Sequence, residues 1–366
     1  MAGYCIGMIG LTHPHSAGHL RTLSVTPEVE RVLLYDPSPA AHAAARAHCP
    51  KAAESFTELD ELLARRDVAA VVIAVPTDQA PALVARAAAA GKHVLCEKPV
   101  GRTAAELAPA LAALAAHQRR CCVFYTWRRH PVILKLRDLV RAGALGRLTS
   151  VELRMVTTQV GLRDPSHWLF KRSVAGGGII SWLGCHWLDA ARFITGQEYD
   201  AVAALTATLS GEPIDVEDVA AVSFRLSGGA LGTLHAGYLI AQGRAGYEGA
   251  TYDNRVIVRG TLGRAEYLWA PAGEQTVELH SAAPGWNTVS RHRFSYLLAD
   301  SPAYGGAHGL EFVREFLHTL EAGGPSPASA VDALRVVEAL DAIYAAAAGG
   351  RTMPVERRDY AGLPGA

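Results

Sequence analysis

Residues 4–15 read YCIGMIGLTHPH, a short apolar run that ends at Gly10 and leads into a segment expected to be helical. This is the usual setting of a phosphate-binding turn, because a helix N-terminus presents free N–H groups and a positive dipole. Only the first glycine of the G-x-G-x-x-G pattern is present, since Thr12 and His15 stand where small residues are usual. We expect Gly10, Thr12 and His13 to contact a dinucleotide; a wider loop that binds no phosphate is the alternative.

The first third of the chain alternates apolar runs with alanine-rich segments. The runs are at residues 4–9, 32–35, 69–75, 93–96 and 121–125, and helices are expected at 40–48, 59–65, 80–90 and 104–117. This alternation is typical of βαβ units and predicts a doubly wound parallel sheet of the Rossmann type. We assign residues 1–125 to this α/β domain.

A different pattern follows Pro131. A helix is expected at residues 132–141, followed by strands at 148–158, 202–209, 220–226, 232–239 and 255–259. These strands lack regular helical crossovers, so residues 126–366 should form an α+β domain with a large, mostly antiparallel sheet. Two periodic helices, at 309–322 and 328–347, are expected to pack back against the rest of the chain.

Charge and cysteine content narrow the class of protein. The 35 basic and 35 acidic residues give a net charge near zero, which disfavours nucleic acid and anionic membranes as partners and favours a small ligand. The six cysteines form no C-x-x-C pair, and no apolar run approaches the ~20 residues of a membrane span, so we expect a cytoplasmic protein without disulfides. The histidines show no zinc-binding spacing, and no metal is expected.

Asp36 follows the second apolar run, about 20 residues beyond the glycine turn. A carboxylate at this position accepts hydrogen bonds from both ribose hydroxyls and repels a 2′-phosphate, so NAD(H) is favoured over NADP(H). Alternatively, Asp36 only starts a turn, and Ser38 caps the next helix.

Residues 91–99 read GKHVLCEKP and closely resemble the G-K-H-V-x-x-E-K-P segment of the Gfo/Idh/MocA oxidoreductases. The resemblance extends over essentially the whole chain, through Arg128-Arg129-His130-Pro131, residues 143–146 (GALG), residues 176–178 (GGG) with Gly184, His186 and Asp189, residues 260–263 (GTLG), and Tyr344 with Gly350-Arg351. It implies a Rossmann domain that binds NAD(H), an open-faced C-terminal sheet, and hydride exchange with a sugar or cyclitol. It also implies a homo-oligomer, either a dimer or a tetramer.

The resemblance assigns Lys98 as the catalytic lysine and His186 as the acid/base histidine. Hydride removal from an alcohol needs a base for the hydroxyl proton and a cation near the oxygen, and these two residue types suit both tasks. A surface lysine and a satisfied core histidine are the alternatives. The segment around Pro76 and Thr77 and the residue Glu97 are expected to line the cofactor with Lys98.

One departure from the family pattern concerns the carboxylate that usually stands four residues before the histidine. Trp182 occupies this position, and an indole cannot accept a proton. Asp189 either orients His186 from one helical turn away or pairs elsewhere. The residues expected to contact substrate are aromatic or charged: Tyr125, Trp127, Lys171, Arg172, Trp182 and Asp189.

Three functions remain open. The leading hypothesis is an NAD(H)-dependent dehydrogenase or reductase acting on a sugar, aminosugar or cyclitol. The altered turn and Trp182 motivate a second, a lyase, hydrolase or isomerase that holds NAD tightly and uses it transiently, or uses none. A third is a non-catalytic ligand-binding homologue, which the presence of both Lys98 and His186 disfavours.

Overall fold

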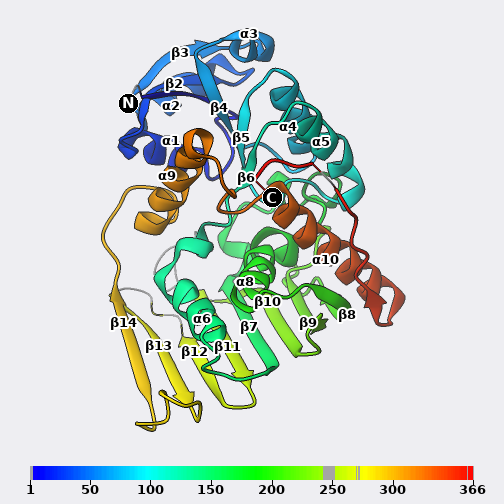
Figure 1. Cartoon of the computed structure of the whole chain (residues 1–366). Coiled ribbons are helices and arrows are strands. Elements are labelled where there is room, and N and C mark those ends of the chain that lie inside the picture. Colours follow the sequence, from blue (N-terminus) through cyan, green and yellow to red (C-terminus); the bar gives the residue numbers. More distant parts are fainter. Residues whose placement is uncertain (1–2, 242–251, 269, 271–272, 361, 366) are drawn as a thin grey trace. The chain divides into compact units, whose positions relative to one another are not determined.

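The computed structural model describes residues 3–241, 252–268, 270, 273–360 and 362–365 (Figure 1). The chain forms two compact units. The N-terminal unit combines Met1–Arg129 with Ala299–Leu334 and Arg358–Ala366, and the C-terminal unit combines His130–Leu298 with Arg335–Arg357. The units therefore differ from a contiguous division near residue 125, because two later segments join the N-terminal unit.

The N-terminal unit is built on a six-stranded parallel sheet with the strand order β3-β2-β1-β4-β5-β6. This is the strand order of a doubly wound dinucleotide-binding sheet, and it confirms the expected fold class. The strands are β1 (Tyr4–Ile9), β2 (Val29–Tyr35), β3 (Ala52–Phe56), β4 (Val68–Ile73), β5 (His93–Cys96) and β6 (Cys121–Val123).

Helices supply the crossovers of this sheet: α1 (Ser16–Val25), α2 (Pro39–Arg46), α3 (Leu59–Ala64), α4 (Ala80–Ala89) and α5 (Ala104–Ala116). The 3₁₀ turn η1 (Thr126–Arg129) follows β6, and α9 (Gly306–Ala322) packs on α1 and η1. The loop before α9 is tied to α1, where Thr22 Oγ1 accepts the Tyr304 N–H at 2.8 Å. Phe312 and Phe316 of α9 are fully buried, so this late helix belongs to the N-terminal core.

The C-terminal unit contains a nine-stranded sheet with the order β14-β13-β12-β11-β7-β10-β9-β8-β15. Only β7 and β10 pair in parallel, and the other neighbours pair antiparallel, which confirms the expected mostly antiparallel sheet. The strands are β7 (Leu148–Thr158), β8 (Tyr199–Ala207), β9 (Val219–Leu226), β10 (Leu231–Ile240), β11 (Tyr252–Gly260), β12 (Gly263–Leu268), β13 (Glu274–Ser281), β14 (His292–Leu297) and β15 (Met353–Pro354).

Helices cover one face of this sheet (Figure 1). The helix α6 (Pro131–Arg141) packs on β12, β13 and α8, and α8 (Cys185–Thr195) packs on β7. Trp187 anchors α8 to the sheet, because its buried indole N–H donates to the carbonyl of Arg154. The remaining elements are η2 (Val160–Leu162), η3 (Trp168–Phe170), α7 (Arg172–Ala175), η4 (Ile180–Gly184), a π-helical turn, and α10 (Ala330–Gly349).

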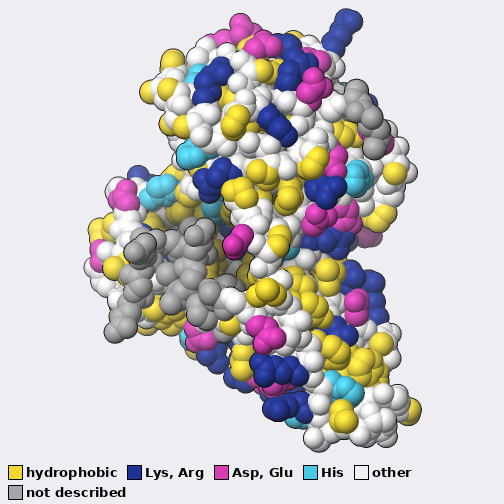
Figure 2. All heavy atoms as spheres, turned by 90° about the vertical axis from the view of Figure 1, so that its left-hand side faces the viewer, with side chains coloured by type: hydrophobic (Ala, Val, Ile, Leu, Met, Phe, Trp, Pro, Cys, Tyr) yellow, Lys and Arg dark blue, Asp and Glu magenta, His cyan; other side chains and the backbone are white. Residues whose placement is uncertain are grey.

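The surface mixes charges of both signs. Figure 2 shows one face, on which basic and acidic side chains are interspersed. This pattern agrees with the zero net charge and gives no continuous basic footprint on that face. Among the described residues, no helix combines the length and apolarity needed to cross a membrane.

His93 at the start of β5 makes stability depend on pH. Its Nδ1 accepts the Arg120 N–H at 3.0 Å, and burial, followed by Arg119 and Arg120, lowers the pKa of the imidazole to about 4. The unfolded chain therefore binds this proton more readily, and stability should fall as pH drops from about 6.5 towards 4. Because His93→Asn keeps an acceptor and removes the titration, we expect it to reduce the acid loss by about 1 kcal/mol, after discounting for solvent screening.

Urea denaturation at pH 7.5 and pH 5 measures this difference. His48→Asn changes an exposed histidine and serves as the matched control. Equal acid sensitivity of wild type and His93→Asn would contradict the assignment.

Candidate active site

Five of the predicted cofactor residues follow the carboxyl ends of strands in the N-terminal sheet. Gly10 follows β1, Asp36 follows β2, Pro76 and Thr77 follow β4, and Glu97 follows β5. The carboxyl ends of parallel strands lie at one edge of a sheet. The neighbours β1 and β4 form the topological switch point, where the strand order reverses. The fold therefore brings these residues to the edge where such sheets bind ligands.

Gly10 opens the turn between β1 and α1. Its φ is +87°, and an added Cβ would lie 2.1 Å from the carbonyl oxygen of Ala74 on the neighbouring strand. Ser16 closes the turn, because its hydroxyl donates to the Gly10 carbonyl at 2.9 Å. Thr12 lies exposed between them. The first glycine of the fingerprint is thus required for the close approach of the turn to the end of β4.

Asp36 is buried at the end of β2. Its Oδ2 accepts the Leu11 N–H at 3.0 Å, and its Oδ1 accepts the Ser38 N–H at 2.9 Å. Ser38 makes no side-chain cap for α2, so the carboxylate shapes the turn into this helix. Each carboxylate oxygen accepts more than one hydrogen bond, which leaves Asp36 able to receive hydroxyl donors as well. Asp36 can therefore shape the turn into α2 and still accept hydrogen bonds from a ribose.

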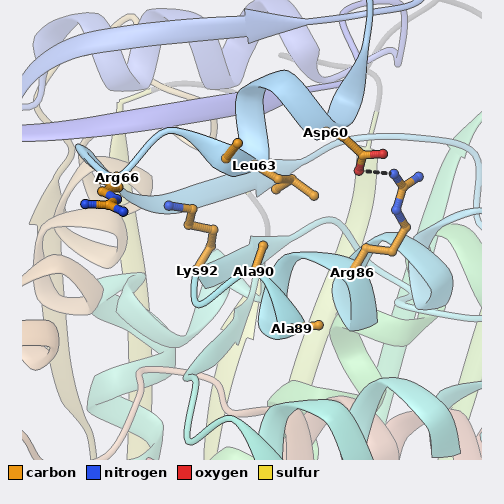
Figure 3. A pocket seen from close by; sticks show the side chains of 8 residues that line it. Asp60, Leu63, Arg66, Arg86, Ala89, Ala90 and Lys92 are labelled. Carbon is orange, nitrogen blue, oxygen red and sulfur yellow. Dashed lines mark hydrogen bonds and ion pairs between the residues drawn. The ribbon is translucent and has the colours of Figure 1, made fainter.

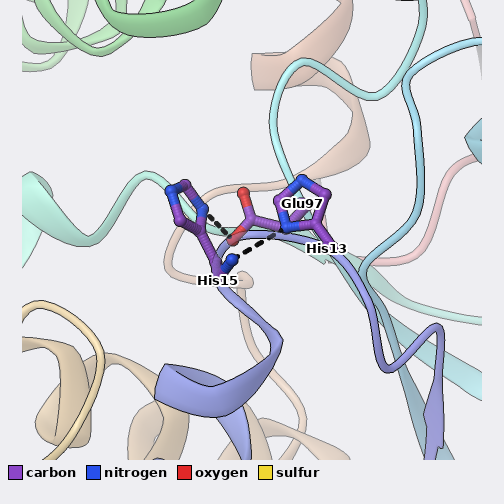
Figure 4. A group of neighbouring side chains, drawn as sticks. All are labelled: His13, His15 and Glu97. Carbon is purple, nitrogen blue, oxygen red and sulfur yellow. Dashed lines mark hydrogen bonds and ion pairs between the residues drawn. The ribbon is translucent and has the colours of Figure 1, made fainter. Parts of the chain in front are cut away.

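A buried cluster of histidines surrounds Glu97 (Figure 4). Glu97 Oε1 lies 2.8 Å from His15 Nδ1 and 2.5 Å from His19 Nε2, and His13 Nδ1 accepts the His15 N–H at 3.1 Å. Burial raises the pKa of Glu97, but His15 and His19 outweigh burial and hold it well below its usual range. Burial lowers the pKa of His13 and His15.

Lys98 is almost completely enclosed, with 1% of its surface exposed. Its backbone N–H donates to Glu97 Oε2 at 3.0 Å, so the carboxylate that receives the histidines also fixes the backbone of the lysine. The Lys98 charge contributes to lowering the pKa of both His13 and His15, which places the ammonium in their electrostatic environment. Lys98 is therefore not the surface lysine of the alternative interpretation.

Tyr304, in the loop before α9, is a site residue that the sequence prediction missed. Its ring centroid lies 4.6 Å from His15 and 4.6 Å from His19. The two following glycines, Gly305 and Gly306, both have positive φ and form the sharp entry to α9. The pair of glycines is a signal for a turn, but nothing in the sequence indicates which earlier segment a tyrosine 289 residues beyond His15 will contact.

His186 occupies the second position of α8 in the C-terminal unit, directly after the π-helical turn η4. Such turns often occur at functional sites. Trp182 lies in that turn, buried at a T-shaped contact of 5.9 Å with Trp168. Asp189 lies 3.7 Å from Arg192, which in turn bonds Glu198 at 2.6 Å. Asp189 thus takes part in an ion-pair network along α8.

Glu217 anchors the glycine-rich entry to η4 and α8 and was also missed. Its buried Oε1 accepts the N–H groups of Gly178 (2.9 Å) and Ile180 (3.2 Å) and the Tyr344 hydroxyl (2.9 Å). Burial raises the pKa of Glu217. Added Cβ atoms would lie 1.8 Å from Tyr344 Oη at Gly177 and 1.9 Å from Glu217 O at Gly178, which explains the run of small residues.

The remaining predicted substrate residues differ in exposure. In the N-terminal unit, Tyr125 is fully buried and Trp127 is half-buried at 6.0 Å from His308. In the C-terminal unit, Lys171 and Arg172 are exposed, and the Arg172 guanidinium lies 3.7 Å from Glu217 Oε2.

A hollow on the N-terminal unit lies at the opposite edge of the sheet (Figure 3). It contains Asp60, Arg86 and Lys92, but Asp60 and Arg86 pair at 2.6 Å, and Lys92 Nζ donates to the carbonyls of Arg65 (2.5 Å) and Val68 (3.0 Å). These three charged side chains are engaged with protein groups, and the predicted cofactor residues lie at the carboxyl edge, which is the stronger candidate site.

Comparisons with known proteins agree with this fold. A model of an oxidoreductase family with an NAD-binding Rossmann fold matches residues 5–125. A model of the GFO/IDH/MocA C-terminal domain matches residues 133–266.

Two curated relatives match along most of their length. Levoglucosan dehydrogenase of Pseudarthrobacter phenanthrenivorans is 28% identical over 316 residues, covering 77% of this chain and 78% of the relative. Inositol 2-dehydrogenase of Rhizobium meliloti is 27% identical over 342 residues, covering 92% and 95%. The solved structure of levoglucosan dehydrogenase in complex with NADH and L-sorbose has the same fold, with a TM-score of 0.84 at 23% identity over 97% of this chain and 99% of that one. The chain therefore belongs to the Gfo/Idh/MocA family of NAD-dependent oxidoreductases.

Proposed function

We propose that the chain transfers a hydride between NAD(H) and a secondary hydroxyl or carbonyl of a sugar, aminosugar or cyclitol, with Lys98 and His186 handling the proton. The observation that carries the proposal is the buried Lys98, held by Glu97 at the carboxyl edge of the dinucleotide-binding sheet. The substrate class is supported by the two curated relatives, which are named for levoglucosan and inositol.

The residues at this edge fit a dinucleotide. The tight turn at Gly10 lets a pyrophosphate approach the start of α1, where Thr12 and His13 offer further donors, and Asp36 offers acceptors for the ribose. Pro76, Thr77 and Glu97 line the neighbouring strand ends. The nicotinamide supplies the hydride acceptor or donor when bound.

The side chains of the protein manage charge and protons. As hydride leaves a carbinol carbon, its oxygen loses a proton and becomes a carbonyl; a cation near that oxygen and a base for the proton lower the barrier. We assign stabilisation of the oxygen to the Lys98 ammonium and acceptance of the hydroxyl proton to His186. Lys98 can also pass a proton to or from this oxygen. Trp182 accepts no proton, so its assigned role is an apolar wall beside His186.

Calorimetric titration with NAD+ and NADH, followed by a panel of substrates that includes myo-inositol and levoglucosan, tests the proposal. Binding of NAD(H) and a substrate-dependent change in nicotinamide absorbance are expected. Absence of nicotinamide binding in the folded protein would overturn the proposal.

A second candidate is a lyase, hydrolase or isomerase that uses tightly bound NAD transiently. Trp182 favours it, because the family's usual carboxylate is replaced by a buried indole. Product formation without net change in nicotinamide absorbance, together with release of NAD from the denatured protein by mass spectrometry, would select this candidate.

Asp36 should determine the choice of cofactor. We expect Asp36→Ala to weaken NADH binding about tenfold or more, because two hydrogen bonds to a charged acceptor are lost. Asp36→Asn keeps one acceptor and removes the charge, so it should narrow the preference for NADH over NADPH. Fluorescence titration with both cofactors measures the ratio, and a ratio unchanged in Asp36→Asn would contradict the role.

We further propose that the chain forms a homo-oligomer, a dimer or tetramer, through the exposed face of the C-terminal sheet. Supporting this, Leu231 on β10 is 58% exposed, Leu268 on β12 is 56% exposed, and β9 alternates buried and exposed residues. Light scattering should give a mass of at least two chains, and a monomeric mass would count against the proposal.

The compartment is proposed to be the cytoplasm. All six cysteines are buried free thiols in the structure, which suits a reducing environment.

A further inference from the structure

The turn after β1 and the end of β5 also bring together a set of side chains that can bind a metal ion. His13, His15 and Glu97 are all buried, and one potential ligand atom from each lies within 4.8 Å of the other two. Two imidazoles and one carboxylate form the protein ligand set of many catalytic zinc sites and of non-haem iron sites. We propose that His13, His15 and Glu97 bind a divalent transition-metal ion of the Zn²⁺, Co²⁺ or Fe²⁺ class.

The positions of the donor atoms support this ligand set. His13 Nδ1 accepts the His15 N–H at 3.1 Å, so this nitrogen carries no proton, and an ion bound there replaces this hydrogen bond. His15 Nδ1 and Glu97 Oε1 lie 2.8 Å apart, and an ion bound to both takes the place of the hydrogen-bond proton between them. The single imidazole proton of His15 then resides on Nε2. Metal bonds of about 2.0–2.2 Å require only small side-chain movements from this arrangement.

His19 acts as a positioning residue for the proposed ion. Its Nε2 lies 2.5 Å from Glu97 Oε1, and it packs against Tyr304 and Phe124, with ring centroids 4.6 and 4.1 Å away. Hydrogen bonds between an imidazole and a ligating carboxylate hold the carboxylate in the orientation that binds the metal ion. Three protein ligands leave at least one coordination position for an oxygen donor.

The local charges set the expected affinity. The negative charge of Glu97 favours binding of a metal cation. The positive charge of Lys98, the next residue, disfavours it by electrostatic repulsion. We therefore expect reversible binding, weaker than that of a closed structural zinc site, and removable by a chelator. This inference does not rest on the proposed dehydrogenase activity, because all ligands lie in the N-terminal unit and metal binding is measured without nicotinamide or substrate.

Metal uptake is the direct test. Protein freed of any affinity tag and treated with chelator is titrated with Co²⁺ and then with Zn²⁺, against a chromophoric competitor. We expect one equivalent of Co²⁺, a visible absorption spectrum of four- or five-coordinate Co²⁺, and its loss when Zn²⁺ displaces it. A spectrum of hexa-aqua Co²⁺, or no stoichiometric uptake by the folded wild type, would overturn the proposal even if no variant were made.

Variants locate the site. His13→Gln and Glu97→Gln should each lower the affinity for Co²⁺ at least tenfold and abolish the rise in melting temperature on adding Zn²⁺, whereas His48→Gln, at an exposed histidine, should bind as wild type does. Equal uptake by His13→Gln, Glu97→Gln and wild type would place the ion elsewhere and refute the assignment. If the wild-type protein takes up the metal ion but binds no nicotinamide, the proposed function is refuted and the metal site is not.

Discussion

Replacing Lys98 with methionine is expected to lower kcat/KM by about 10²–10⁴-fold, the range for loss of a group that stabilises charge or moves a proton in the transition state. Methionine keeps most of the apolar stem and removes the ammonium. Because Lys98 is 1% exposed, the substitution removes a buried charge and leaves its backbone contact with Glu97 in place. Most of the effect should therefore appear in kcat, with NADH affinity changed much less.

Lys92→Met is the matched control for this experiment. Lys92 is also buried and lies just before β5, but its ammonium donates to backbone carbonyls at the opposite edge of the sheet. The control should lose stability without a comparable loss of kcat. Steady-state kinetics and urea denaturation on both variants separate the two effects. Comparable kcat values for Lys98→Met and wild type would remove Lys98 from the proposed chemistry.

The sequence predicted the N-terminal sheet because its strands are buried on both faces. Runs such as residues 4–9 and 93–96 are nearly all apolar, and both coincide with the observed strands β1 and β5. The strand β3 was missed because it lies at the edge of the sheet and reads AAESF, with two exposed positions. Edge strands have less surface to bury, so their sequences carry less of the pattern.

In the C-terminal sheet the same reasoning identified β7 to β11 but not β12 to β14. Those three strands form the outer end of the sheet, and β14 alternates half-buried with exposed residues. A prediction of strands from the alternation of apolar and polar residues is weak where few positions are fully buried.

For the candidate site, the sequence predicted the residues that follow strand ends but not the partners that come from distant segments. Gly10 and Asp36 could be placed because a parallel sheet gathers its carboxyl ends at one edge, and Lys98 was assigned from the resemblance of residues 91–99 to the family motif. Tyr304 and Glu217 could not, because each reaches its site through tertiary packing that no local pattern encodes. The sequence predicted His13 as a cofactor contact, but its proximity to Glu97, and that of His15, come from the structure alone.

Gly10→Ala is expected to cost about 2–5 kcal/mol of unfolding free energy and to abolish tight NADH binding. Two penalties add: an L-residue at φ +87° costs about 1–2 kcal/mol, and a Cβ 2.1 Å from the Ala74 carbonyl oxygen forces the backbone of β4 or of the turn to move, at about 1–3 kcal/mol. The same displacement spoils the approach of a pyrophosphate to the start of α1.

Gly91→Ala separates these penalties. Gly91 also has a positive φ, +79°, but an added Cβ there meets no atom within 4 Å. It follows α4 at the opposite edge from Gly10, so the control should lose only about 1–2 kcal/mol and bind NADH normally. Urea denaturation and NADH titration of both variants compare the two positions directly. Equal losses of stability in Gly10→Ala and Gly91→Ala would show that close packing at the turn does not restrict position 10 to glycine. Unchanged NADH affinity of Gly10→Ala would show that the pyrophosphate binds elsewhere.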